Sequence, residues 1–288
     1  MSDQRIIKSP LNYIGGKYKL LPQILPLMPD NIKVFVDLFG GGFNVGINVN
    51  SQRVIYNDIV YQVTQLMKKL SETSEKEVLA HIRSRIDEFK LSKTNAEGFY
   101  KFRELYNKNP LPLDLYVLVC FSFNHQIRFN NNMQYNNPFG KDRSSFSKSL
   151  EEKLLSFIKR LHGINADFYS LDFTEFDYSH LTTEDLVYCD PPYLISTAAY
   201  NDGKRGFKGW NEELEIALLT KLDDLNEKGV RFALSNVLEH KGKTNRILEK
   251  WSSKYTIHNI SHDYSNSNYQ TKNRDKESTK EILVTNFS

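Results

Sequence analysis

The sequence is poor in the residues that build disulfide frameworks and metal clusters. It has two cysteines among 288 residues, Cys120 and Cys189, and both lie in apolar runs. We interpret them as buried free thiols of a protein that works in a reducing cytoplasm, because two cysteines make neither a disulfide scaffold nor a zinc cluster. The seven histidines lack the spacing of a metal-binding motif, so we expect no catalytic metal.

Long hydrophobic runs and a strong net charge are also missing. No stretch is long and apolar enough to cross a membrane. Gly15 and Gly16 interrupt the only candidate for a signal peptide. The formal net charge is only +3, but residues 121–160 hold seven basic and three acidic side chains, a local charge of +4. This local excess suits contacts with phosphates, although an ordinary solvated surface explains the same pattern.

The sequence does contain a regular alternation of strand-like and helix-like segments. Strands are expected at 33–38, 53–58, 168–171, 185–189, 230–235, 255–260 and 281–285. Helices are expected at 111–123, 149–161, 212–226 and 243–251, with a further helix beginning at 45–49. Such alternation predicts an α/β fold with an open, largely parallel sheet. A polar, mainly helical block interrupts it, so we expect residues 1–60 and 161–288 to form the core and residues 61–160 an inserted domain.

The most specific motif is Asp190-Pro191-Pro192-Tyr193, which directly follows the apolar strand-like segment 186–189. Open α/β proteins bind ligands at the carboxyl ends of such strands. Two successive prolines fix φ and remove two backbone donors, which leaves a stiff turn whose carbonyls can accept hydrogen bonds. A carboxylate, free carbonyls and an aromatic ring therefore meet in one turn.

This turn suits chemistry on an aromatic amine. The lone pair of such an amine is conjugated into its ring, so the nitrogen is a poor nucleophile. Acceptance of its N–H hydrogens by Asp190 and by the Pro191 carbonyl favours a pyramidal nitrogen with a localised lone pair. Placement and electrostatic stabilisation then suffice without a covalent enzyme intermediate. The ring of Tyr193 can stack on a base that has left its duplex.

A second motif is the glycine-rich turn at residues 37–42, which includes Asp37, Phe39, Gly40 and Gly41. Consecutive glycines allow a ligand to approach the backbone closely. The turn has neither dehydrogenase nor P-loop spacing, and a glycine-rich turn alone is a weak signal. Asp58 ends the next expected strand, where an acid can bind the ribose of an adenosine-containing cofactor, although turn aspartates are also common.

Taken together, the motifs and their order resemble the Dam-type family of DNA adenine methyltransferases, in the α arrangement. The matching residues run from Tyr13-x-Gly15-Gly16-Lys17 through the glycine turn and Asp58 to the catalytic turn, and span nearly the whole chain. The resemblance implies a Rossmann-like core that binds S-adenosylmethionine. It further implies that residues 61–160 form the domain that recognises the target DNA.

The resemblance also assigns roles to individual residues. Catalysis falls to Asp190, Pro191, Pro192 and Tyr193. The cofactor site comprises Tyr13, Gly15, Gly16, Lys17, Asp37, Phe39, Gly40, Gly41, Asp58, Asp172, Phe173 and Asp190. The segment 123–140, which we expect to form a β-hairpin, is similar to the DNA-reading hairpin of the family. There the DNA contacts are Phe123, Asn124, Arg128, Asn130, Pro138 and Lys141.

General chemistry agrees with those DNA contacts, since an aromatic such as Phe123 can wedge into the gap left by a flipped base and Arg128 can pair with a guanine edge. An Asn-rich surface hairpin is the alternative. His125 and Gln126 stand where relatives often have Gly, and Asn137 where Val is common, so the recognition sequence is open. Segments 196–210 and 265–280 are expected to be loops. We suggest that the first becomes ordered over DNA or cofactor, with a passive surface loop as the alternative.

We therefore expect methyl transfer from S-adenosylmethionine to the N6 amine of adenine in a short duplex sequence, by base flipping. We expect a monomer, with a separately acting restriction endonuclease as a candidate partner. Three enzymatic alternatives share this fold: methylation of RNA adenine, of a cytosine amine, or of a protein glutamine. Asp190 disfavours the last, whose members usually have Asn-Pro-Pro-Tyr, and cytosine enzymes more often have Ser-Pro-Pro-Tyr. A non-catalytic DNA-binding protein is a further alternative.

Overall fold

The computed structural model describes residues 6–13, 15–195, 209–261 and 279–287. Its central element is an eight-stranded sheet of order β3-β2-β1-β4-β5-β8-β7, in which β6 also pairs with β5. The strands are β1 Ile32–Asp37, β2 Ser51–Asn57, β3 Ala166–Tyr169, β4 Leu186–Cys189, β5 Arg231–His240, β6 Lys243–Thr244, β7 Thr256–Ile260 and β8 Thr279–Thr285.

The direction of the strands determines where a ligand can bind. Strands β3, β2, β1, β4 and β5 run parallel to one another, whereas β8 is antiparallel to both β5 and β7. The chain moves outward in one direction through β2 and β3 and in the other through β4 and β5. The switch point therefore lies between the carboxyl ends of β1 and β4, where open α/β sheets bind ligands.

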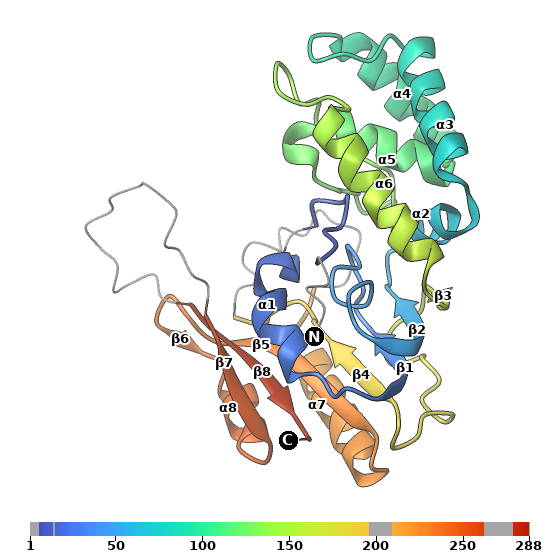
Figure 1. Ribbon diagram of the computed structural model, residues 1–288. Coiled ribbons are helices and arrows are strands. Elements are labelled where there is room, and N and C mark those ends of the chain that lie inside the picture. The colour runs from blue at the N-terminus through green and yellow to red at the C-terminus, as the bar shows by residue number, and fades with distance from the viewer. Residues whose placement is uncertain (1–5, 14, 196–208, 262–278, 288) are drawn as a thin grey trace.

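Two groups of helices accompany the sheet. In Figure 1, α2 to α6 lie together at one end of the molecule, and α7 and α8 lie beside the sheet. The α-helices are α1 Leu21–Ile24, α2 Tyr61–Glu72, α3 Glu75–Glu88, α4 Ala96–Lys108, α5 Pro112–Phe121, α6 Lys148–His162, α7 Glu212–Glu227 and α8 Arg246–Ser252. The 3-10 helices are η1 Lys17–Leu20, η2 Leu25–Leu27 and η3 Phe123–His125.

Both faces of the sheet are covered by hydrophobic cores. On β4, Leu186 and Tyr188 belong to one core, and Val187 and Cys189 belong to the other. Successive side chains of a strand point to opposite faces, so a strand that is buried on both sides needs a continuous apolar run. This requirement explains why the strands are readable in the sequence. Every expected strand is present, with bounds shifted by a few residues.

Local side-chain bonds account for two differences from expectation. The predicted helix at 45–49 is wrong, because this segment forms turns. Asp37 accepts a hydrogen bond from the Gly46 amide, and the side-chain amide of Asn48 donates to the Asn44 carbonyl. The hairpin at 123–140 folds back through two isolated antiparallel bridges, Ser122–Phe139 and Phe129–Tyr135, rather than through continuous strands. Asn side chains compete with ladder bonds there.

Several composition-based expectations can be compared with the structure. Both cysteines are free and buried. Within the described ranges, no helix has the length and apolarity needed to cross a bilayer. The same residues contain no cluster of side chains suited to a metal ion. The predicted loops at 196–210 and 265–280 lie, apart from their last two residues, outside the described residues.

Candidate active site

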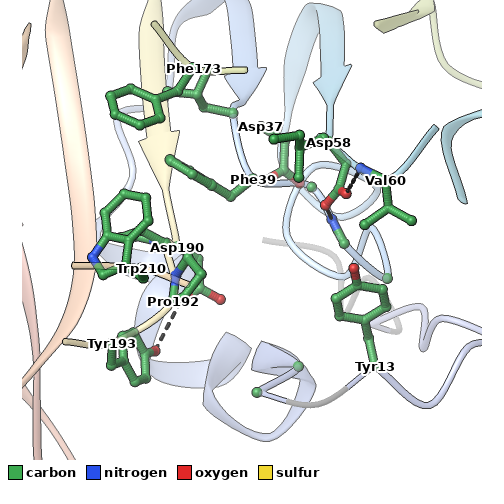
Figure 2. A pocket seen from close by; sticks show the side chains of 18 of the residues that line it. Tyr13, Asp37, Phe39, Asp58, Val60, Phe173, Asp190, Pro192, Tyr193 and Trp210 are labelled. Carbon is green, nitrogen blue, oxygen red and sulfur yellow. Dashed lines mark hydrogen bonds between the residues drawn. The ribbon is translucent and has the colours of Figure 1, made fainter. Parts of the chain in front are cut away.

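A cavity of about 880 Å³ opens at the switch point of the sheet. It joins the glycine turn after β1, the acid after β2, the segment after β3 and the catalytic turn after β4. Every residue predicted for the cofactor and for catalysis lines it: Tyr13, Gly15, Gly16, Lys17, Asp37, Phe39, Gly40, Gly41, Asp58, Asp172, Phe173, Asp190, Pro191, Pro192 and Tyr193. Motifs that are far apart in the sequence thus share one cavity (Figure 2).

The glycine turn brings backbone to the wall of this cavity. A Cβ atom on Gly40 would lie 2.4 Å from the ring of Tyr56, so no larger residue fits there. Gly41 has a φ of +48°, a conformation that glycine adopts without strain. The Tyr56 hydroxyl donates to the Gly41 carbonyl at 2.9 Å and fixes the turn from below.

Asp58 anchors the same turn from the neighbouring strand. Its Oδ2 accepts a hydrogen bond from the Gly41 amide at 2.8 Å, and its Oδ1 accepts one from the Val60 amide at 2.8 Å. Burial raises the pKa of Asp58 to about 6, while the two amide bonds lower it. Each carboxylate oxygen has two lone pairs, so Asp58 can also accept hydrogen bonds from a ligand in the cavity.

Three aromatic rings form one wall of the cavity. The rings of Phe39 and Trp210 lie 5.8 Å apart, those of Phe39 and Phe173 5.8 Å, and those of Phe173 and Trp210 5.7 Å. In Figure 2 these rings lie together on one side, and Asp58 and Tyr13 lie on the other. Aromatic rings with such spacing suit a flat heteroaromatic ligand, which can stack on them or insert at their edge.

Trp210 is held in place by a buried acid on α7. Its indole Nε1 donates to Glu215 at 2.6 Å, and the amides of Asn236 and Asn245 also donate to that carboxylate. Glu215 is only 1% exposed. Burial raises its pKa, while the three donors, Trp210 first, lower it. A buried carboxylate needs such donors, so the network fixes the orientation of the indole ring.

The catalytic turn carries an ion pair rather than an isolated carboxylate. Nζ of Lys17 lies 2.8 Å from Oδ1 of Asp190 and also donates to the Gly15 carbonyl at 3.0 Å. The hydroxyl of Tyr193 lies 2.9 Å from the same Oδ1. Burial raises the pKa of Asp190, and the nearby Lys17 ammonium opposes that rise. Both contacts use Oδ1, so Oδ2 is the oxygen best placed to serve a substrate.

The residues predicted to contact DNA lie beside the cavity, and only Arg128 lines it. Arg128 also lines a smaller adjoining pocket with Asn130 and Asn136. Its buried Nε, like Oδ1 of Asn136, has no hydrogen-bond partner among the described residues. Buried polar atoms normally have a partner in the protein or in ordered water, so these two atoms can take a solvent molecule or a polar group of a ligand as a partner.

The other predicted DNA contacts are arranged around the same segment. Phe123 is 40% exposed, with the Arg143 guanidinium over its ring. The Phe123 amide donates to the Pro138 carbonyl. Asn124 has a φ of +53°, and its carbonyl accepts a hydrogen bond from Asn12, which ties this segment to the start of the chain. Lys141 is exposed.

The comparison with known families agrees with this geometry. The profile of the D12 class N6 adenine-specific DNA methyltransferases matches residues 13–266. The chain belongs to this family. Members of a DNA methyltransferase family require a methyl donor and a DNA substrate, and both requirements suit a cavity beside an open, basic segment.

Individual D12 relatives show the same likeness. Type II methyltransferase M.FokI of Planomicrobium okeanokoites is 57% identical over 98% of this chain and 43% of its own length. Modification methylase StsI of Streptococcus sanguinis is 50% identical over 99% and 44%, respectively. DNA adenine methylase of Escherichia coli (strain K12) is 28% identical over 78% and 79%. The chain thus spans less than half the length of the first two relatives.

Two acids of the D12 site escaped the sequence analysis. Glu215 supports the aromatic wall, and Glu281 contacts the catalytic turn. Trp210 ends the segment 196–210, which the sequence analysis interpreted as a loop that becomes ordered over DNA or cofactor, without assigning a role to Trp210 itself. One signal in the sequence could have pointed to Glu281: it is a charged residue directly before the apolar run 282–284, which is buried in β8. Such a residue in a strand is buried with a partner or is exposed, and the sequence does not say which.

Proposed function

We propose that this chain transfers a methyl group from S-adenosylmethionine to the N6 amine of adenine in a short duplex DNA sequence. One observation carries the proposal. The cavity of about 880 Å³ is lined both by the glycine turn with Asp58 and by the Asp190 turn. A cofactor and a flipped base therefore have room to meet beside one carboxylate. Membership of the D12 class supports adenine as the base.

The residues present fit S-adenosylmethionine. The wall of Phe39, Phe173 and Trp210 suits the adenine ring, and Asp58 suits the ribose hydroxyls. We assign Tyr13 and the turn at Gly15 and Gly16 to the methionine end, because they line the part of the cavity next to Lys17. When bound, the cofactor supplies an electrophilic methyl group on a positively charged sulfur.

The chain's own residues prepare the amine. Oδ2 of Asp190 and the Pro191 carbonyl accept its two N–H hydrogens, and the nitrogen lone pair is then directed away from the adenine ring. Asp190 would take one amine proton as an N–CH₃ bond replaces the S–CH₃ bond of the donor; the S–C electron pair would stay on the sulfur, which leaves as a neutral thioether, and the N–H electron pair would stay on nitrogen. The raised pKa of Asp190, caused first by burial, makes it a better proton acceptor than an exposed aspartate.

We propose that residues 61–160 recognise the DNA. Helices α2 to α6 form a group at one end of the molecule (Figure 1), and the segment 123–140 connects that group to the cavity. Phe123 fills the space that the flipped adenine leaves. Asn124, Asn130, Pro138 and Lys141 contact the duplex around it.

Replacing Arg128 by Ala is expected to relax specificity at one base pair. The guanidinium lines both the cavity and the adjoining polar pocket, so it can form a bidentate pair with a guanine. Loss of that pair costs about 1–3 kcal/mol of discrimination. Competition binding between the target duplex and single-base variants measures the change. Arg83→Ala is the matched control, because Arg83 pairs with Glu151 on exposed helix surface. Uniform weakening on all duplexes would contradict base reading and identify a phosphate contact.

Replacing Trp210 by Phe is expected to remove the fluorescence change on cofactor binding. The chain has two tryptophans, Trp210 and Trp251, and only Trp210 lines the cavity. Titration of the wild type with S-adenosylmethionine should change the emission, and the dissociation constant of the Trp210 variant should rise by roughly tenfold as stacking is reduced. Trp251→Phe should keep the signal. A change that follows Trp251 instead would contradict the assigned cofactor site.

We also propose that the chain acts as the modification enzyme of a restriction–modification system, beside a separate endonuclease. The names of the relatives M.FokI and StsI, a type II methyltransferase and a modification methylase, support this role. All residues assigned to the site come from one chain, so we propose that a monomer is sufficient. We also propose a cytoplasmic location, because the proposed substrate is DNA and the named relatives are bacterial.

The direct test is transfer of labelled methyl from S-adenosylmethionine to duplex DNA by the purified chain. Digestion of the product to nucleosides then identifies the base. The proposal predicts label in N6-methyl-2′-deoxyadenosine. Label in N4-methylcytosine, label only when RNA is supplied, or no label with folded, cofactor-bound protein would each overturn it.

A further inference from the structure

A second buried carboxylate lies behind the catalytic turn. Glu281 is on β8, where it pairs in register with Val237 of β5, and it is only 4% exposed. Its Oε1 lies 3.0 Å from the Tyr193 hydroxyl and 3.4 Å from Nζ of Lys17. None of the family motifs includes this residue, yet it shares the immediate surroundings of Asp190.

The two acids share the same donors. Lys17 is 4% exposed and contacts both Oδ1 of Asp190, at 2.8 Å, and Oε1 of Glu281, at 3.4 Å. The Tyr193 hydroxyl lies 2.9 Å from Asp190 and 3.0 Å from Glu281, while it accepts a hydrogen bond from Lys17 at 2.5 Å. One hydroxyl hydrogen serves one carboxylate at a time. Asp190 and Glu281 therefore compete for one ammonium group and one O–H donor.

We propose that Glu281 is a positioning residue that keeps Asp190 basic by drawing Lys17 and Tyr193 partly toward itself. The proposal rests on the proposed methyl transfer, in which Asp190 accepts a proton from the amine. With Glu281 ionised, neither donor is committed to Asp190 alone, and Oδ2 of Asp190 faces the substrate with more negative charge. Glu281 itself touches neither the base nor the cofactor in this account.

The sign of the effect follows from the charges. A like charge raises the pKa of a carboxyl group, and an opposite charge or a donated hydrogen bond lowers it. Glu281 therefore raises the pKa of Asp190, and Lys17 and Tyr193 lower it. The other titratable groups that face Asp190 are Asp37 on β1 and Tyr188 and Cys189 on β4. Of these three groups only Tyr188 also has its pKa raised by the charge of Glu281.

The test is the pH profile of the single-turnover methylation rate, with saturating DNA and cofactor. Glu281→Gln keeps the shape of the side chain but removes its charge, so Lys17 and Tyr193 turn fully to Asp190. We expect the acidic limb of the profile to move to lower pH by about one unit. The rate on the high-pH plateau should fall roughly tenfold, because Asp190 becomes a weaker proton acceptor.

Two further variants separate this role from a merely structural one. Glu281→Asp retains the charge and should restore the wild-type position of the limb. Glu239→Gln is the matched control, because Glu239 is an acid on the adjoining strand β5 whose side chain is 50% exposed and pairs only loosely with Lys280, at 3.8 Å. It should leave both limb and plateau unchanged. Glu281→Ala should reproduce the downward shift and carries the test if the Gln variant does not fold.

Three results would overturn the inference. The first is an acidic limb of the pH–rate profile that stays in place in Glu281→Gln or Glu281→Ala. The second is an acidic limb that moves to higher pH in these variants. The third is a shift in Glu281→Asp as large as that in Glu281→Gln. Failure of the proposed function is distinct, since the wild type would then transfer no methyl to adenine at any pH. In that case the proposed role of Glu281 is also wrong, because it depends on the proposed methyl transfer.

Discussion

Replacing Asp190 by Ala is expected to lower the rate of methyl transfer by about a thousandfold or more, the order expected when a proton acceptor and an electrostatic contact are lost together. The protein should still fold, because Lys17, which loses Asp190, keeps Glu281 as a partner at 3.4 Å. Duplex binding should survive, since the predicted DNA contacts lie elsewhere. Single-turnover methylation and fluorescence anisotropy with labelled duplex measure the two properties separately.

Two controls sharpen the Asp190 result. Asp190→Asn preserves shape and removes charge, so it should also be strongly impaired if the carboxylate accepts the proton. Asp177→Ala should behave as the wild type, because the Asp177 side chain is 74% exposed and is not part of the lining of the cavity. Persistent methylation by the Ala variant would show that another group accepts the amine hydrogens.

Replacing Asp58 by Ala is expected to weaken binding of S-adenosylmethionine by roughly 10-fold to 100-fold. Hydrogen bonds to a charged group contribute about 1.5–3 kcal/mol each, and Asp58 also holds the Gly41 and Val60 amides at 2.8 Å. Removal of its carboxylate therefore removes the ribose acceptor and loosens the glycine turn. Isothermal titration calorimetry with the cofactor, in the absence of DNA, measures the affinity directly.

The matched control for Asp58 is Asp167→Ala. Asp167 is on β3, pairs with Arg53 at 2.6 Å and has a side chain that is 40% exposed, so it resembles Asp58 in charge but lies outside the cavity lining. Its replacement should leave cofactor affinity unchanged. If Asp58→Ala bound the cofactor as tightly as the wild type, the adenosine end would have to lie elsewhere in the cavity.

The sheet was predictable because its central strands are buried on both faces. Burial on both faces requires apolar runs such as 186–189, and the predicted functional residues lie where those runs end. Asp37, Asp58 and Asp190 are each at or next to the end of a parallel strand. Topology brings such strand ends together, so the residues that the sequence analysis predicted for cofactor and catalysis line one cavity.

Contacts made across the chain were not predictable in the same way. Glu281 meets Lys17 although 264 positions separate their numbers in the sequence, and no local pattern encodes that meeting. Trp210 depends on Glu215, Asn236 and Asn245, which come from three separate elements. The turn at 44–49 and the irregular segment 123–140 differ from expectation because side-chain amides and carboxylates take over backbone hydrogen bonds there.

The most direct test of the central claim is single-molecule sequencing of DNA from a methylation-free bacterial host that expresses this chain. The account predicts N6-methyladenine in one short sequence motif, and its absence when the host expresses Asp190→Ala at the same level. Methylated cytosine would contradict the assignment of the base. Unmodified DNA, with soluble wild-type protein that binds S-adenosylmethionine, would contradict the proposed function itself.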